Sequence, residues 1–170
     1  MRSAFLSLAA LMAVAGMATA GKVEIKDVHL CCKQCVDGVA GALKKVDGVT
    51  NPKCDQKAKT VTFTTKDDKT TAAALKALAD AGYFGKPTDD GKEAKFEVTP
   101  PDGKADDVTV KSVHVCCKQC QNAINDLFKD AKVSYSGAGA QKEVKISGKG
   151  LEKAKVLETL QKAGFNGKVE

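Results

Sequence analysis

The chain has 170 residues, with 27 Lys and Arg against 21 Asp and Glu and a formal net charge of +6. Hydrophobic residues make up 43% and charged residues 28%, a balance that excludes a wholly disordered chain and a membrane protein with several spans. Aromatic residues are 5%, Trp is absent and Arg2 is the single arginine. The chain therefore has few side chains that could stack on nucleic-acid bases or contact them through a guanidinium group. We therefore expect no nucleic-acid partner.

The first 20 residues have the layout of a secretory signal peptide. Arg2 supplies the positive start, an apolar run follows at 4–17, and Ala-Thr-Ala at 18–20 forms a small-x-small cleavage site. The run is about 14 residues long, short of the ~20 that a membrane-spanning helix needs. We expect a mature chain of 150 residues (170 − 20) that is soluble, has no membrane span and is periplasmic or secreted. An uncleaved membrane anchor is the alternative.

The mature chain contains one unit twice. Val-His-Leu-Cys-Cys-Lys-Gln-Cys at 28–35 recurs as Val-His-Val-Cys-Cys-Lys-Gln-Cys at 113–120, an offset of 85 residues (113 − 28). The joining segment is rich in Asp, Gly, Lys and Pro, as linkers are. The expected organisation is a signal peptide at 1–20, a first domain at 21–98, a linker at 99–106 and a second domain at 107–170.

Hydrophobic periodicity predicts the elements of each unit, with period two for strands and i, i+3, i+4, i+7 spacing for helices. In the first unit these are a strand at Val23 and Ile25, a helix through Val36, Val39, Ala40 and Leu43, an edge strand at 49–54, a strand at 60–63, a helix through Leu75, Leu78 and Ala79, and a late strand at 94–98. In the second unit they are a strand at Val108 and Val110, a helix through Cys120, Ala123, Ile124 and Leu127, an edge strand at 133–138, a strand at 143–146 and a helix through Leu157 and Leu160.

The last helix of each unit runs into a glycine followed by an aromatic residue, Gly82–Tyr83 and Gly164–Phe165, which suits a helix C-cap. Each unit thus has the order βαββαβ. We expect an α+β fold of two tandem ferredoxin-like domains, each an antiparallel sheet with two helices on one face.

Six of the seven cysteines lie in the repeated motifs. Cys32 and Cys35, like Cys117 and Cys120, are three residues apart at the expected first turn of a helix, so their side chains share a face. The positive end of the helix dipole lowers thiol pKa there, and the lysine inside each motif adds positive charge. Such paired thiolates either bind a soft metal ion or exchange disulfides.

The extra cysteine and the histidine of each motif favour metal binding. Disulfide exchange needs two sulfurs and a third thiol risks scrambling, whereas a soft metal gains from another thiolate or an imidazole. Cys31 and Cys116 are therefore candidate third thiolates, with packing at the turn as the alternative. His29 and His114 are candidate ligands or neighbours of ligands, with an exposed or backbone-bonded histidine as the alternative. Cys54 has no counterpart in the second unit, and we expect a partly buried strand thiol.

This layout, with a cysteine pair after the first strand, resembles the heavy-metal-associated (HMA) domain family, which includes copper chaperones and the periplasmic mercury-binding protein. Laid on the family motif Gly-Met-x-Cys-x-x-Cys, the metal-binding cysteines fall on Cys32, Cys35, Cys117 and Cys120. The resemblance implies copper(I) or mercury(II) held by two thiolates and passed to a partner by ligand exchange. It also matches Tyr83 and Phe165 to the aromatic or basic residue that this family has near its metal loop.

The motif departs from the family at three positions. Glycine is replaced by His29 and His114, methionine by Leu30 and Val115, and the x position by Cys31 and Cys116. Leu30 and Val115 can still anchor the loop as buried apolar residues. Three thiolates suit copper(I), mercury(II) or cadmium(II), and a histidine as fourth ligand would make tetrahedral zinc(II) possible.

We therefore expect a non-enzymatic, extracytoplasmic protein that sequesters or passes on a soft metal ion, copper(I) first, with a membrane metal transporter or another metal-accepting protein as recipient. The two motifs either act separately or share one metal cluster between the domains. The alternatives are a thiol–disulfide redox protein and a binding module with structural disulfides. The candidate metal ligands are Cys31, Cys32, Cys35, Cys116, Cys117 and Cys120, and the candidate auxiliary residues are His29, His114, Tyr83, Phe165, Lys33 and Lys118.

Overall fold

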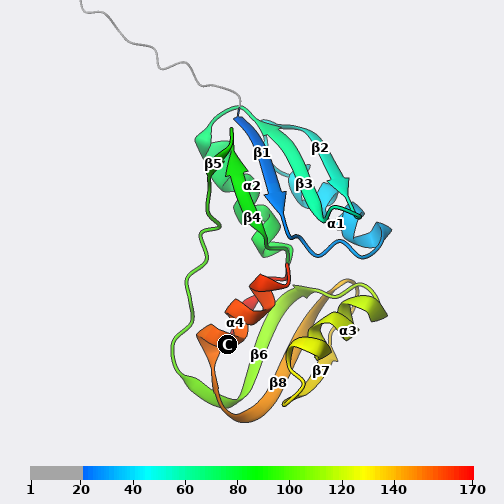
Figure 1. Cartoon of the computed structure of the whole chain (residues 1–170), viewed down its shortest axis with the longest axis vertical. Helices are drawn as coiled ribbons and strands as arrows, with labels where there is room; N and C mark the ends of the chain where they lie inside the picture. The colour runs from blue at the N-terminus through cyan, green and yellow to red at the C-terminus, as the bar shows by residue number, and fades with distance from the viewer. Residues whose placement is uncertain (1–20) are drawn as a thin grey trace, which may run out of the picture.

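The computed structural model describes residues 21–170, and the expected signal peptide lies outside the described residues. The described chain forms two units, which lie one above the other in Figure 1. The first unit consists of β1 (Gly21–Lys26), α1 (Lys33–Leu43), β2 (Val49–Asp55), β3 (Thr60–Thr65), α2 (Asp68–Asp80), β4 (Lys86–Asp89) and β5 (Lys92–Glu93). The second consists of β6 (Lys104–His114), α3 (Lys118–Leu127), β7 (Lys132–Ser136), β8 (Gln141–Glu152), α4 (Lys153–Lys162) and β9 (Lys168–Val169).

Each unit has one sheet in which all neighbouring strands are antiparallel. The strand orders are β2-β3-β1-β4-β5 and β7-β8-β6-β9. This α+β arrangement is compatible with the expected pair of ferredoxin-like units, and β2 and β7 lie at sheet edges as predicted. β6 begins inside the segment expected as a linker, at Lys104.

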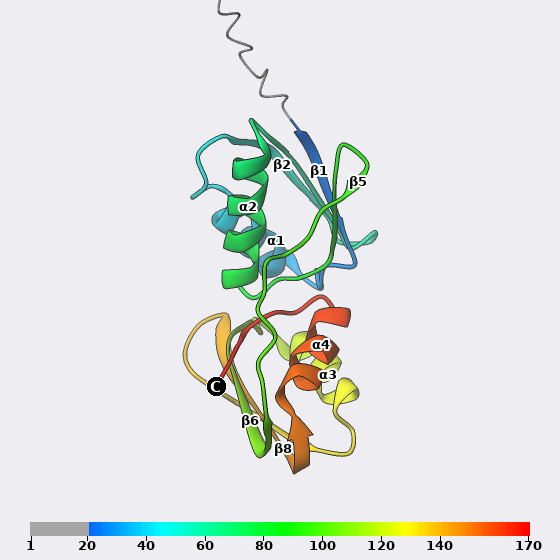
Figure 2. The same ribbon diagram turned by 90° about the vertical axis from the view of Figure 1, so that its left-hand side faces the viewer.

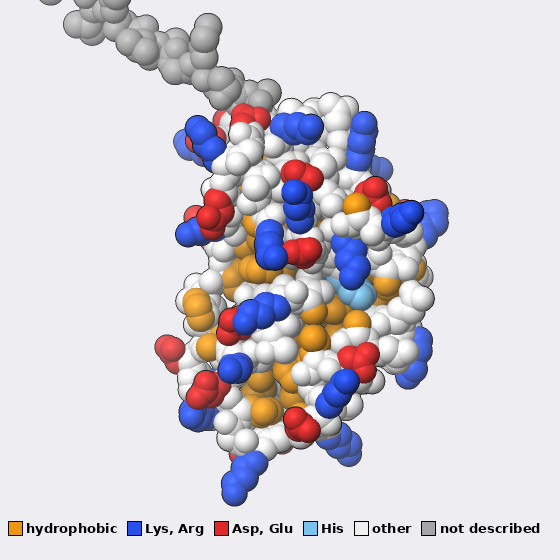
Figure 3. Space-filling model, viewed as in Figure 1, with side chains coloured by type: hydrophobic (Ala, Val, Ile, Leu, Met, Phe, Trp, Pro, Cys, Tyr) orange, Lys and Arg blue, Asp and Glu red, His pale blue; other side chains and the backbone are white. Residues whose placement is uncertain are grey.

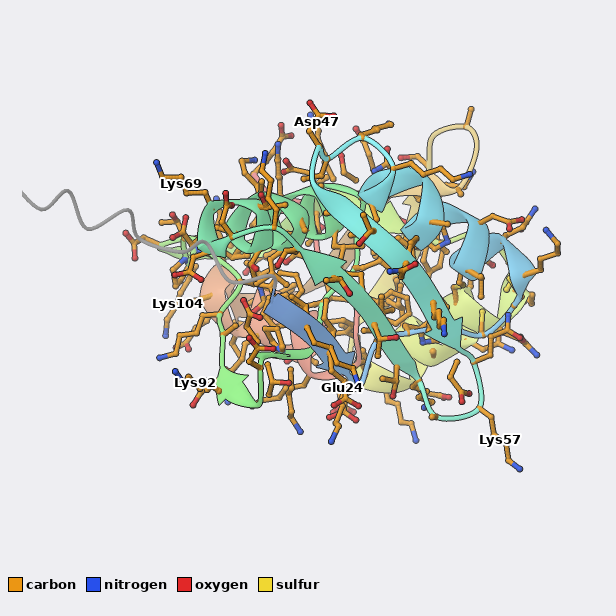
Figure 4. The ribbon with its side chains drawn as sticks, turned by 90° about the horizontal axis from the view of Figure 1, so that it is seen from above. Glu24, Asp47, Lys57, Lys69, Lys92 and Lys104 are labelled. Atoms are coloured by element: carbon orange, nitrogen blue, oxygen red, sulfur yellow. The ribbon has the colours of Figure 1, made fainter. Side chains whose placement is uncertain are left out.

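Two helices pack on one face of each sheet, and the helices of the two units lie on opposite sides of the molecule in Figure 2. None of the helices in residues 21–170 is long and apolar enough to cross a membrane. Charged side chains such as Lys57, Lys69 and Lys92 point outward from the ribbon in Figure 4. Lysines and acidic residues are interspersed over the face seen in Figure 3, so their charges partly cancel locally.

The core follows from the alternation of each strand. Val23 and Ile25 of β1 and Val61 and Phe63 of β3 are buried against the helices, while the residues between them are more exposed. The second unit repeats this arrangement with Val108, Val110, Val144 and Ile146. Burying each of these side chains contributes about 1.5–3 kcal/mol to the stability of the fold. The buried first strand of each unit thereby fixes the position of the cysteine motif that follows it.

The strand expected at 94–98 is absent, and that prediction was wrong. The strand that pairs with β1 on the side away from β3 is β4, where Ile25 pairs with Pro87 and Val23 with Asp89. A two-residue turn of Asp90 and Gly91, both at positive φ, then joins β4 to β5. Asp-Gly favours this type of hairpin, but Pro87 masked the strand signal. Proline has no backbone N–H to donate, and Pro87 is tolerated in β4 because β5 pairs only with Thr88 and Asp89.

The glycine caps are confirmed. Gly82 and Gly164 follow α2 and α4 with φ of 90° and 86°, a conformation that glycine adopts without a steric penalty. The amide of Tyr83 donates to the carbonyl of Leu78, and that of Phe165 donates to the carbonyl of Leu160, both at 3.0 Å. These Schellman-type caps turn the chain back, so each aromatic ring points towards the other unit.

Candidate metal centre

The two units meet through these glycine–aromatic turns. Tyr83 and Phe165 form an antiparallel bridge. The amide of Phe84 donates to the carbonyl of Gly164 at 3.1 Å, and the amide of Asn166 donates to the carbonyl of Gly82 at 3.0 Å. Because the contacts are reciprocal, the repeated units face each other with approximate two-fold symmetry.

Glycine is also required here for close approach. A Cβ atom on Gly82 would collide with the backbone nitrogen of His114, and one on Gly164 would collide with the backbone nitrogen of His29. Each turn therefore packs directly on the histidine of the other unit's cysteine motif. This packing brings the first motif (residues 28–35) and the second motif (residues 113–120) together.

Within each unit, helix geometry places the cysteines. Cys32 and Cys117 have extended backbones and are the N-cap residues of α1 and α3. Cys35 and Cys120 lie in the first helical turns and are buried. Leu30 and Val115 are buried beneath the motifs, as expected of apolar anchors.

Sulfur atoms from the two motifs lie in contact with one another. Cys31 Sγ lies 3.4 Å from both Cys117 Sγ and Cys120 Sγ in the other unit. Reciprocally, Cys116 Sγ lies 3.4 Å from Cys32 Sγ and 3.6 Å from Cys35 Sγ. The pairs within each Cys-x-x-Cys are 3.9 Å and 3.8 Å apart, for the first and second motif respectively.

Two overlapping groups of four sulfurs could each hold a metal ion, and in each group the sulfurs lie within 4.8 Å of one another. One is Cys31, Cys32, Cys35 and Cys116, and the other is Cys31, Cys116, Cys117 and Cys120. All six predicted ligands therefore come together in one cluster. Cys31 and Cys116 belong to both groups, which the sequence did not indicate. Cys54 belongs to neither, and all seven cysteines have free thiols in this structure.

The clustered thiols share protons unequally. The pKa of Cys35 is lowered by the neighbouring side chains of Cys120 and His114 and by backbone amides, against the opposing effect of burial. The pKa of Cys120 is raised by the neighbouring Cys35 thiol and by burial. Burial raises the pKa of Cys31 to about 12 and also raises the pKa of Cys116. For Cys117, burial raises the pKa, but hydrogen bonds from the Cys120 amide and the Cys31 thiol outweigh it and lower the pKa to about 7.

The histidines pack across the interface. His114 stacks on Tyr83 of the first unit with ring centroids 4.6 Å apart, and His29 stacks on Phe165 of the second at 4.2 Å. The Nε2 atoms of both histidines are buried and have no hydrogen-bond partner among residues 21–170. Burial lowers the pKa of His29, so its imidazole is neutral near pH 7. Neither histidine belongs to the two groups of residues in 21–170 that could hold a metal ion, so the structure places both rings in the interface between the units and not among the ligands.

The remaining auxiliary candidates have structural positions. Tyr83 donates its hydroxyl to the backbone carbonyl of Cys35 at 2.9 Å, and Phe165 is buried against His29. Lys33 is exposed and pairs with Asp37 at 2.7 Å, while Lys118 bonds weakly to Gln121. The aromatic residues therefore support the motifs, whereas both lysines point along their own helices.

Chemically, the arrangement offers six thiol ligands in two groups, which suits soft metal ions. No protein-family model matches this chain, and no curated protein matches it significantly. The geometry of the cluster therefore carries the functional argument.

Proposed function

We propose that this protein binds and sequesters a soft metal ion through the six motif cysteines, and copper(I) is the ion that we favour. The observation that supports the proposal is the convergence of both motifs on one cluster, with sulfur separations of 3.4–3.9 Å. Thiolates prefer soft ions such as copper(I), and a group of three sulfurs matches the low coordination number that copper(I) accepts. Four-coordinate cadmium(II) or zinc(II) is the next choice, because each group can supply a fourth sulfur.

The proposed protein is non-enzymatic, extracytoplasmic and similar in design to HMA domains. The support for the HMA-like design is the βαββαβ order with a Cys-x-x-Cys at the start of the first helix of each unit. The support for export is the signal-peptide pattern in the sequence of residues 1–20. Its recipient would be a membrane metal transporter or another metal-accepting protein.

Release would occur by associative exchange. Cys35 and Cys120 are buried, whereas Cys32 and Cys117 are partly exposed at the helix N-caps. Cys31 and Cys116 are partly exposed as well. An incoming partner thiolate would therefore join the ion from the side of these partly exposed cysteines, and one of them would leave first. This accessibility fits release that depends on a partner thiolate.

The test is a copper(I) titration of the full chain, exported with its own first 20 residues and purified without oxygen. We expect copper binding that is abolished when all six motif cysteines are changed to Ser. Cys54→Ser is the matched control and should bind as the parent does. Intact mass would test cleavage after residue 20. Failure of the unsubstituted, reduced protein to bind copper(I), mercury(II) or cadmium(II) would contradict the proposal.

A thiol–disulfide function is the second candidate. It is favoured by the 3.4 Å separation of Cys31 and Cys117 and by the lowered pKa of Cys117, which increases the thiolate fraction. It predicts disulfide reductase or isomerase activity in metal-free protein, which sequestration does not require.

A further inference from the structure

We propose that the metal sites are crossed: Cys116 completes the Cys32–Cys35 site of the first unit, and Cys31 completes the Cys117–Cys120 site of the second. This inference rests on the proposed function and names the third ligand of each site. The sequence left open whether the two motifs act separately or share one cluster, and it did not assign Cys31 or Cys116 to the cysteine pair of the other unit.

Sulfur distances define the two crossed triads. Cys32, Cys35 and Cys116 form a triangle with edges of 3.9, 3.4 and 3.6 Å. Cys117, Cys120 and Cys31 form a second triangle with edges of 3.8, 3.4 and 3.4 Å. Every edge of both triangles is a direct sulfur contact. Cys31 also lies 3.6 Å from Cys35 in its own motif, and Cys116 lies 3.7 Å from Cys120, so the crossing is distinguished by the 3.4 Å contacts of Cys116 with Cys32 and of Cys31 with Cys117.

These edges fit a three-coordinate soft ion. With metal–sulfur bonds of about 2.3 Å, three sulfurs around a central ion are about 4.0 Å apart. The observed edges of 3.4–3.9 Å need only a small expansion to reach that size. The fold thus brings each triad close to the dimensions of a three-coordinate site, which reduces the ordering cost of binding.

The surrounding contacts hold the crossing in place. The Tyr83 hydroxyl bonds to the Cys35 carbonyl in its own unit and to His114, two residues before Cys116, in the other. His29, two residues before Cys31, packs on Phe165 of the second unit. Because each third ligand follows a residue anchored on the opposite unit, separating the units would remove it from the site. Metal binding should therefore also clamp the units together.

The experiment isolates one site at a time in the full chain. In a Cys117→Ser/Cys120→Ser background only the first pair remains, with both Cys31 and Cys116 available to it. Copper(I) affinity is measured by competition with a colorimetric chelator after adding either Cys116→Ser or Cys31→Ser. The mirror series uses a Cys32→Ser/Cys35→Ser background. Circular dichroism and thermal unfolding of every variant check that it folds.

The crossed arrangement predicts opposite rankings in the two series. With the first pair, Cys116→Ser should weaken copper binding by at least about tenfold, since even changes around a metal ligand cost that much, and Cys31→Ser should weaken it less. With the second pair the ranking should reverse. Equal effects, or a larger effect of the cysteine from the same motif, would overturn the crossing while leaving the proposed function intact. Absence of copper binding by the unsubstituted protein would overturn both.

Discussion

The Tyr83 hydroxyl lies 3.0 Å from Nδ1 of His114, although the two residues belong to different units. Their rings also stack, at 4.6 Å between centroids. The equivalent pair, Phe165 and His29, keeps the stack but has no hydroxyl. The two halves of the interface are thus alike in packing and different in hydrogen bonding.

Removing the Tyr83 hydroxyl should weaken the interface. Tyr83→Phe leaves the stack but deprives the Cys35 carbonyl and His114 of a partner in a buried site, so we expect a loss of about 1 kcal/mol in the free energy of unfolding. Chemical denaturation measures it. Tyr135→Phe is the control, because that hydroxyl bonds within the second unit in a more exposed place, where water can replace it. A larger loss in the control would count against the interface role.

Adding a methyl group at Gly82 should separate the units. Gly82→Ala combines a positive φ with a collision against the His114 backbone, which cannot move aside as a side chain can. Gly91→Ala has the same backbone problem but open space around its Cβ, so it should cost only about 1–2 kcal/mol. We expect Gly82→Ala to lose more stability in thermal unfolding and to bind copper(I) more weakly. Equal behaviour of the two variants would show that the close approach is unimportant.

Metal binding should protect six thiols and leave one. Cys54 lies outside both sulfur groups and is partly exposed, so a thiol reagent should count seven thiols in the reduced metal-free protein under denaturing conditions and one in the native copper-loaded protein. Mass spectrometry after alkylation should place the label on Cys54. Copper-loaded Cys54→Ala should then show none. Labelling of Cys31 or Cys116 in the loaded protein would show that they are not ligands.

Copper affinity should rise with pH. The pKa values of Cys31, Cys116 and Cys120 are raised, so these thiols are protonated near pH 7 and must release protons when metal binds. Because the pKa of Cys117 is lowered to about 7, this thiol is mostly protonated only below that pH, where it releases one more proton when metal binds. The rise of copper affinity with pH should therefore be steeper below pH 7 than above it. Competition titrations at several pH values, corrected for the chelator's own protonation, measure this slope. An affinity that does not change with pH would contradict thiol ligation.

The sequence alone was sufficient for what depends on local periodicity. Alternation at Val23 and Ile25, helical spacing at Val39 and Leu43, and the repetition of the motif predicted the order of elements in both units. The Asp90–Gly91 turn was also readable, since Asp-Gly is a strong hairpin signal, but Pro87 and the apolar residues at 94–98 diverted the prediction. The six ligand candidates followed from residue type and spacing, without any knowledge of how the motifs are placed.

Only the tertiary structure decided that those six sulfurs form one cluster and that Cys31 faces Cys117 and Cys120. Periodicity specifies which face of its own unit a residue occupies, and it carries no information about how two units dock. That docking depends on the glycine–aromatic turns, where Gly82 and Gly164 lack the Cβ atoms that would hold the backbones apart. The sequence determined which atoms can bind a metal, and the packing of the repeated units determined which of them lie together.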